Sequence, residues 1–235
     1  MKRIFFHLAV SLVTFIIGVS VTAIFWLYIG PDVTLPEAAK FDMRSSCFPG
    51  LSVWSVKSNA QTEFFPTVAL WRNSSANHFV NNWYSSHLIA MNEKPLSAHE
   101  DEDESYRFLW LRTFHHPISI HVSRTGDHYF MAVNQLSGQG GYEPGTLDVN
   151  WGRAISEDDW DLFLMHLEHS NFWLMPTPGD VASTDGARWI MEGYREGRYH
   201  VVDRQSPAPG AYADACLYLL KQSGLLAKLP TTEVY

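Results

Sequence analysis

Residues 118–133, ISIHVSRTGDHYFMAV, decide the fold class because they alternate apolar and polar side chains on both sides of a turn signal. A four-residue turn at 124–127 would pair Ser123 with His128. This register places apolar residues opposite one another on one face of the hairpin. They are Ile118, Ile120 and Val122 on the first strand and Val133, Met131 and Tyr129 on the second. The stretch therefore predicts an antiparallel hairpin within a meander over 106–154.

A second hairpin is expected over 188–204, with its turn at 195–198. Apolar residues at helical spacing predict helices at 76–92, 157–169 and 211–223. Ser156 is the expected N-cap of the middle helix, and Asp159 completes a capping box. Because the strands come as consecutive hairpins, we predict an α+β domain in which the three helices cover one side of an antiparallel sheet.

An uncharged apolar run, LAVSLVTFIIGVSVTAIFWLYI, occupies residues 8–29. A helix of this length is about 33 Å long, enough to cross hydrocarbon about 30 Å thick. Lys2 and Arg3 precede the run, which predicts a single-pass anchor in the cell inner membrane with residues 1–7 in the cytoplasm. Residues 30–46 would then be a juxtamembrane linker and 47–235 an extracytoplasmic domain. A signal peptide cleaved near 21–23 is the alternative, but the run is longer than a signal peptide requires.

Small residues recur every four positions in this run, at Thr14, Gly18 and Thr22. Such spacing lets two membrane helices pack closely, so this face is a candidate for helix pairing. The alternative is that the threonine hydroxyls bond to carbonyls of their own helix.

The chain has 235 residues and a formal charge of −8. Without Lys2 and Arg3 it keeps 15 basic and 25 acidic residues, so the remainder carries −10. An acidic chain without a cluster of basic residues argues against nucleic acid and anionic membrane surfaces as partners. The length suits one domain with a hydrophobic core.

Only two cysteines are present, Cys47 and Cys216. Outside the cytoplasm they could form one long-range disulfide, which would stabilise the fold by about 4–5 kcal/mol on the chain-entropy view. Two independent buried thiols are the alternative, because Cys216 lies on the apolar face of an expected helix.

Eleven histidines raise the question of a metal site. In the predicted hairpin, His121 and His128 share the outward face as diagonal neighbours, about 7–8 Å apart. A zinc site needs three or four ligands, and the spacing supplies no third one, so no metal is predicted and exposed histidines are the simpler interpretation. The glycines of 137–145 precede a strand-like segment instead of a helix, so no cofactor is predicted either.

Glu192 and Asp203 fall on one face of the second hairpin as diagonal neighbours. A carboxylate pair is what a glycosidase requires, which makes the two residues candidates for catalysis. Four arginines, at positions 188, 195, 198 and 204, lie nearby in the sequence. Surface ion pairs therefore explain the carboxylates more simply, and no catalytic residue is predicted.

Several short motifs lie in the C-terminal quarter. They are Phe172-Trp173, Asp185-Gly186-Ala187, Trp189, Glu192-Gly193, Tyr199 to Arg204, Ser206-Pro207 and Leu217 to Leu225. Together they resemble a segment of an uncharacterised family of exported or membrane-anchored bacterial proteins. The resemblance implies a bacterial source and an exported domain, and it implies no named activity.

Three functions fit these observations. We expect a non-catalytic, membrane-anchored extracytoplasmic domain that binds a protein or an envelope component. The alternatives are a cell-envelope hydrolase that uses either Glu192 and Asp203 or a histidine site, and a structural subunit that pairs through its transmembrane helix.

Overall fold

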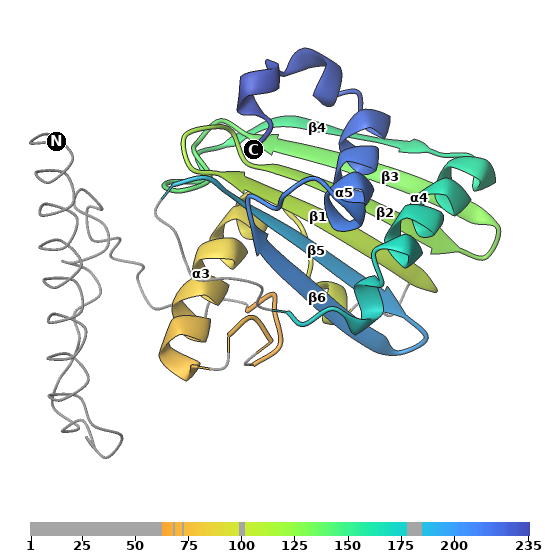
Figure 1. The fold of residues 1–235 in the computed structure, drawn as a ribbon, viewed down its shortest axis with the longest axis horizontal. Helices are drawn as coiled ribbons and strands as arrows, with labels where there is room; N and C mark the ends of the chain where they lie inside the picture. Colours follow the sequence, from red (N-terminus) through yellow and green to blue (C-terminus); the bar gives the residue numbers. More distant parts are fainter. Residues whose placement is uncertain (1–62, 68, 72, 99–101, 178–184) are drawn as a thin grey trace, which may run out of the picture. The chain divides into compact units, whose positions relative to one another are not determined.

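A computed structural model describes residues 63–67, 69–71, 73–98, 102–177 and 185–235. Six strands form one antiparallel sheet in the order β4-β3-β2-β1-β5-β6 (Figure 1). The strands are β1 (Glu104–Arg112), β2 (Ile118–Thr125), β3 (His128–Leu136), β4 (Leu147–Ala154), β5 (Ala187–Arg195) and β6 (Arg198–Gln205). The α-helices are α3 (Ser74–Ala90), α4 (Glu157–His169) and α5 (Ala211–Gln222). The predicted α+β class is confirmed.

The β2–β3 hairpin forms, but its predicted register is wrong by two residues. Thr125 pairs with His128, where Ser123 was expected, so the turn contains only Gly126 and Asp127. Gly126 has a φ of 58°, a conformation that glycine adopts without strain at the first position of a tight hairpin turn. A shift of two residues keeps every side chain on its predicted face of the sheet.

The β5–β6 hairpin has the predicted turn. Arg195 pairs with Arg198, which leaves Glu196 and Gly197 as the two turn residues. Both have positive φ, 53° and 74°, as the tight turn that matches strand twist requires.

Helices α4 and α5 pack on the same face of the sheet. The first turn of α4 confirms the predicted cap, because the Ser156 hydroxyl accepts the N–H of Asp159 at 3.1 Å and donates to its carboxylate at 2.9 Å. Large apolar side chains of the sheet fill the space beneath the two helices. They include Tyr106, Phe108, Trp110, Ile120, Val133, Trp189 and Met191.

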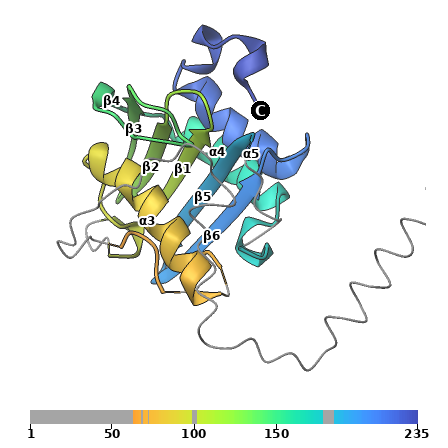
Figure 2. The same cartoon turned by 90° about the vertical axis from the view of Figure 1, so that its left-hand side faces the viewer.

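Helix α3 lies on the opposite face of the sheet, as Figure 2 shows, so the prediction that all three helices cover one side is wrong. The reason lies in β1, which is buried at all nine positions. Its alternate residues Leu109 and Leu111 point away from α4 and α5 and pack with Tyr84 and Leu88 of α3. A strand whose side chains are buried on both faces needs a cover on each.

None of the helices in the described part of the chain is long and apolar enough to cross a bilayer. The expected span at 8–29, with Thr14, Gly18 and Thr22, and the 30–46 linker lie outside the described residues. They stay predictions.

Candidate functional site

The inner face of α3 carries polar side chains that fix the helix in place. Its first turn is capped by Asn73, whose side chain accepts the N–H of Ala76 at 3.0 Å. Asn81 is fully buried and bonds both the N–H and the carbonyl of Phe65, at 3.4 and 2.8 Å. These contacts tie α3 to the segment before it and set Tyr84, one turn farther on, against the sheet.

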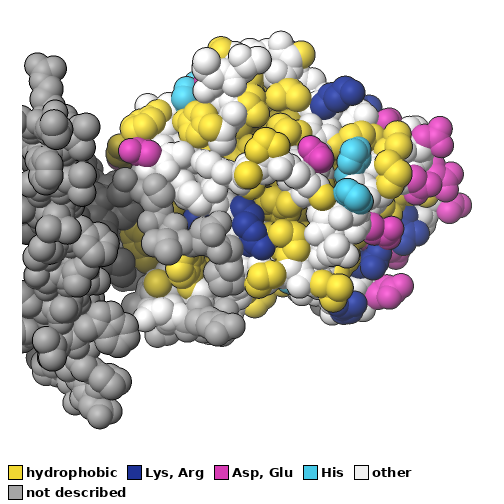
Figure 3. Space-filling model, viewed as in Figure 1, with side chains coloured by type: hydrophobic (Ala, Val, Ile, Leu, Met, Phe, Trp, Pro, Cys, Tyr) yellow, Lys and Arg dark blue, Asp and Glu magenta, His cyan; other side chains and the backbone are white. Residues whose placement is uncertain are grey.

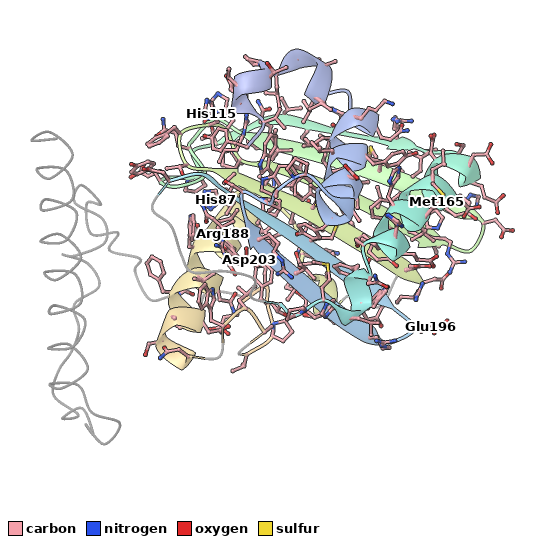
Figure 4. The ribbon with its side chains drawn as sticks, viewed as in Figure 1. His87, His115, Met165, Arg188, Glu196 and Asp203 are labelled. Atoms are coloured by element: carbon pink, nitrogen blue, oxygen red, sulfur yellow. The ribbon has the colours of Figure 1, made fainter. Side chains whose placement is uncertain are left out.

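Asp203 of β6 is the centre of a buried group beneath α3, and Figure 4 shows it next to Arg188. One oxygen of its carboxylate accepts from the Arg188 guanidinium at 2.5 Å and from the Tyr84 hydroxyl at 2.9 Å. The same hydroxyl accepts from Arg188 Nε at 2.9 Å. Burial raises the pKa of Asp203, and the charge of Arg188 opposes that rise. The three side chains therefore form a buried ion-pair group, in which the other oxygen of the Asp203 carboxylate has no hydrogen-bond partner among the described residues.

A second buried group surrounds Arg107 of β1. Its guanidinium contacts Glu192 through Nε at 2.7 Å and Nη2 at 2.6 Å, and Glu93 through Nη1 at 3.3 Å. Tyr199 donates to the other carboxylate oxygen of Glu192 at 2.8 Å. Burial raises the pKa of Glu192, and Arg107 and Tyr199 oppose the rise. Both oxygens of Glu192 are thus occupied by side chains of the protein.

Glu93, on the segment after α3, extends this group across the sheet. It accepts from Ser119 at 3.1 Å and from Asn134 at 3.0 Å, in addition to Arg107. Burial acts to raise the pKa of Glu93, but Arg107, His121 and these donors outweigh it, so the pKa lies below its usual value. Glu93 is therefore held as a carboxylate with donors on both oxygens.

The structure brings Glu192 and Asp203 together as the spacing predicts. Glu192 pairs with Val201 and Asp203 with Ile190, so the two carboxylates are diagonal neighbours on one face. The sequence predicted ion pairs at the surface, and this location is wrong, because the side chains of Glu192 and Asp203 are fully buried. Each carboxylate has an arginine partner, and the partner of Glu192 comes from β1 instead of from its own hairpin.

The two candidate metal histidines do not meet. His121 pairs with Ala132 and His128 with Thr125, so they share a face but lie four residues apart along the strands. His121 is near Glu93 and Glu102, with N–O distances of 3.8 and 3.4 Å. Within residues 63–235, less the gaps given above, no three potential ligands are arranged to hold a metal ion.

Cys216 is fully buried on the inner face of α5. Burial raises the pKa of this thiol above the usual range for cysteine. Cys47 lies outside the described residues, so the disulfide stays a prediction.

Two loops at one end of the sheet present an exposed aromatic pair that the sequence analysis did not single out. Phe114, in the β1–β2 turn, is 53% exposed, and Tyr142, in the β3–β4 loop, is 39% exposed. Their ring centroids lie 6.2 Å apart. His115, labelled in Figure 4, marks this end of the molecule. Adjacent exposed aromatic rings from two loops are a candidate binding surface.

Backbone contacts hold the two loops against each other. The N–H of Gly140 donates to the Arg112 carbonyl at 3.0 Å, and that of Gly141 donates to the Thr113 carbonyl at 3.1 Å. A Cβ on Gly140 would lie 2.6 Å from the backbone nitrogen of Arg112, so only glycine allows this approach. The Trp83 indole of α3 adds a bond to the Gly140 carbonyl at 2.9 Å. The aromatic pair therefore rests on a rigid support.

The surface charge agrees with the acidic composition. Helix α4 opens with Glu157, Asp158 and Asp159, and acidic side chains gather at that end of the molecule in Figure 3.

Comparison with protein-family models gives no match to the chain, and no curated protein matches it.

Sequence reasoning missed Arg107, Glu93 and Tyr84, which complete the two buried groups. A signal for Arg107 was present, because it stands in an otherwise apolar strand, YRFLWL (106–111). A charge in such a strand needs a buried partner of opposite sign. The loop residue Glu93 and the helical Tyr84 carry no comparable signal.

Proposed function

We propose that this chain is a single-pass membrane protein whose extracytoplasmic domain binds a protein or an envelope component without catalysis. The exposed pair Phe114 and Tyr142 on its rigid support is the observation that carries the proposal. Aromatic side chains are enriched in interface cores, and a rigid support lowers the entropy lost on binding.

The state of the candidate catalytic residues supports a non-catalytic role. An acid or base must reach the proton that it transfers, and a nucleophile must reach its substrate. Glu192 and Asp203 are fully buried, and each is neutralised by an arginine that also shields it. These groups instead support the fold around the loops, because α3 contacts both Asp203 and the Gly140 loop.

The membrane anchor and its orientation are part of the proposal. They rest on the uncharged run 8–29 and on Lys2 and Arg3 before it. A reporter fused after Tyr235 that is active only outside the cytoplasm is the expected result. A reporter active only in the cytosol would refute the orientation.

Binding is tested by placing a photo-crosslinking amino acid at position 142 of the full chain in native membranes. A discrete crosslinked product is expected, because the ring at this position would lie within the interface. The matched control is Glu196, an exposed residue of the β5–β6 turn at the other end of the sheet. Equal products from both positions, or none from position 142, would refute the binding surface.

A further inference from the structure

The two edge strands of the sheet differ in whether another segment of the chain covers them. At the β6 edge, the N–H of Asp203 donates to the Thr177 carbonyl at 3.0 Å. The Arg204 side chain adds bonds to the carbonyls of Thr177 and Pro176, at 2.8 and 2.9 Å. The segment before β5 therefore covers this edge at Asp203 and Arg204, and a further strand has no access there.

The β4 edge is open in the described part of the chain. The N–H of Ile155 donates to the Tyr129 carbonyl at 3.0 Å, so the backbone of Ile155 points toward β3. In an antiparallel pair, the backbone N–H and C=O groups of successive residues point alternately toward the partner strand and away from it. Odd-numbered residues between Val149 and Arg153 direct their backbone groups toward β3, and Asn150 and Gly152 direct theirs outward. No described residue bonds these outward groups, and both residues are exposed. Figure 2 shows β4 at the outer limit of the sheet.

The β4 sequence has only part of the usual protection of an exposed edge, in the charged side chains of Asp148 and Arg153. Residues 147–154, LDVNWGRA, contain no proline and no lysine, and the only irregularity faces its first residues, at Gln135 and Leu136 of β3. From Val149 onward the strand is regular. Such an edge is a template for one more antiparallel strand.

We propose that β4 pairs with β4 of a second copy of this chain, antiparallel and with Asn150 on the two-fold axis. An axis perpendicular to the sheet keeps both copies facing the same way, so paired residues must share a face. In this register Val149 of each copy lies opposite Trp151 of the other, an apolar pair formed twice. Asp148 lies opposite Gly152, so no like charges meet.

The closed β6 edge selects a dimer over a filament. Addition of β4 to β6 of another copy would be a head-to-tail contact that repeats without closing. The contacts of Thr177 and Pro176 with β6 occupy the place of that strand. Only the isologous contact between two β4 strands remains, and it joins the two six-stranded sheets into one.

A charge exchange on the two-fold axis tests the proposal on the full chain in detergent, with the molar mass measured by light scattering. Asn150→Lys and Asn150→Glu each bring two like charges together, so each is expected to halve the molar mass of the protein. An equimolar mixture is expected to return to the dimer mass, because unlike charges then face each other. Gln139→Lys, an exposed change in the β3–β4 loop, is the control and should stay dimeric.

The rescue by mixing separates this contact from misfolding, since a variant that cannot fold gains nothing from its counterpart. A monomeric wild type, dimers that persist in both single variants, or a mixture that stays monomeric would overturn the proposal. So would a dimer that Gly18→Ile abolishes while Asn150→Lys does not, because association would then belong to the membrane helix. Crosslinking at position 142 is independent of all these outcomes and tests the proposed function alone.

Discussion

The two faces of the sheet bury side chains of different chemistry, and β1 displays both within nine residues. Toward α4 and α5 it presents Tyr106, Phe108 and Trp110, which pack with other apolar and aromatic side chains. Toward α3 it presents Arg107 and Leu109, in a layer where charges and apolar side chains alternate. The α4 and α5 face is held mainly by apolar burial, and the α3 face combines apolar burial with compensated charge.

The difference shows what each face tolerates. Apolar side chains of similar volume substitute for one another at modest cost, because their attraction has no direction. Buried charges are sensitive to the loss of a single partner, because the remaining charge stays desolvated. On the α3 face Arg107 serves two carboxylates, Glu192 and Glu93, so the balance of charge there depends most on one arginine.

Arg107→Leu is expected to have the largest effect, a loss of about 3–5 kcal/mol in the free energy of unfolding. It leaves two buried carboxylates without their shared cation. Denaturant unfolding measured by circular dichroism tests this. Arg198→Leu is the control, because Arg198 is exposed and its guanidinium lies over the Trp173 ring, so a loss below about 1 kcal/mol is expected. Equal losses in the two variants would contradict the importance of the buried charge.

On the apolar face, Leu219→Ala is expected to lose about 3 kcal/mol, because it opens a cavity beneath α5. The loss should be the same at pH 4 and pH 7, since leucine is uncharged and its buried cluster contains no carboxylate or histidine. Leu174→Ala, at a position 83% exposed, is the matched control and should change stability by less than about 0.5 kcal/mol. A strong pH dependence of the Leu219→Ala loss would break the contrast between the faces.

Glu93→Gln tests whether the stability of the α3 face depends on pH, unlike that of the apolar face. Its folded-state pKa lies below the usual 4.5, so its ionised form contributes stability above that pH and loses it as the pH falls through the lowered pKa. We expect a loss of about 2 kcal/mol at pH 7, in line with charged hydrogen bonds. The difference from wild type should shrink below about pH 4.5. Unfolding curves of both proteins from pH 3 to 7 test this, and a difference that grows on acidification would refute it.

Local patterns predicted much of the fold. The Ser156 cap and the Arg195–Arg198 turn depend on neighbouring residues, and both form where the sequence places them. The β2–β3 register failed because RTGD allows a two-residue or a four-residue turn, and both keep the same faces. Nothing local decides between them.

Long-range arrangement was harder to predict. The place of α3 on the second face depends on the cover that β1 needs, and a single helix pattern does not show which face it will meet. Likewise, the sequence suggested arginines near Glu192 and Asp203 as their partners. This was right for Asp203, which pairs with Arg188, and wrong for Glu192. Arg107 lies 85 residues away from Glu192, and only the pairing of β1 with β5 joins them.

The smallest effect on stability is expected at the aromatic pair, where Phe114→Ser should change the free energy of unfolding by less than about 0.5 kcal/mol. Phe114 is more than half exposed, and the ring beside it belongs to Tyr142, which is also exposed, so little buried area is lost. The same change should abolish the crosslink from position 142, because interface aromatics contribute to binding out of proportion to their number. Phe130→Ser, another exposed aromatic on β3, is the control and should leave the crosslink intact. If Phe114→Ser unfolded the domain, the pair would be a support for the loops, and the contrast between a stabilising interior and a binding surface would fail at this point.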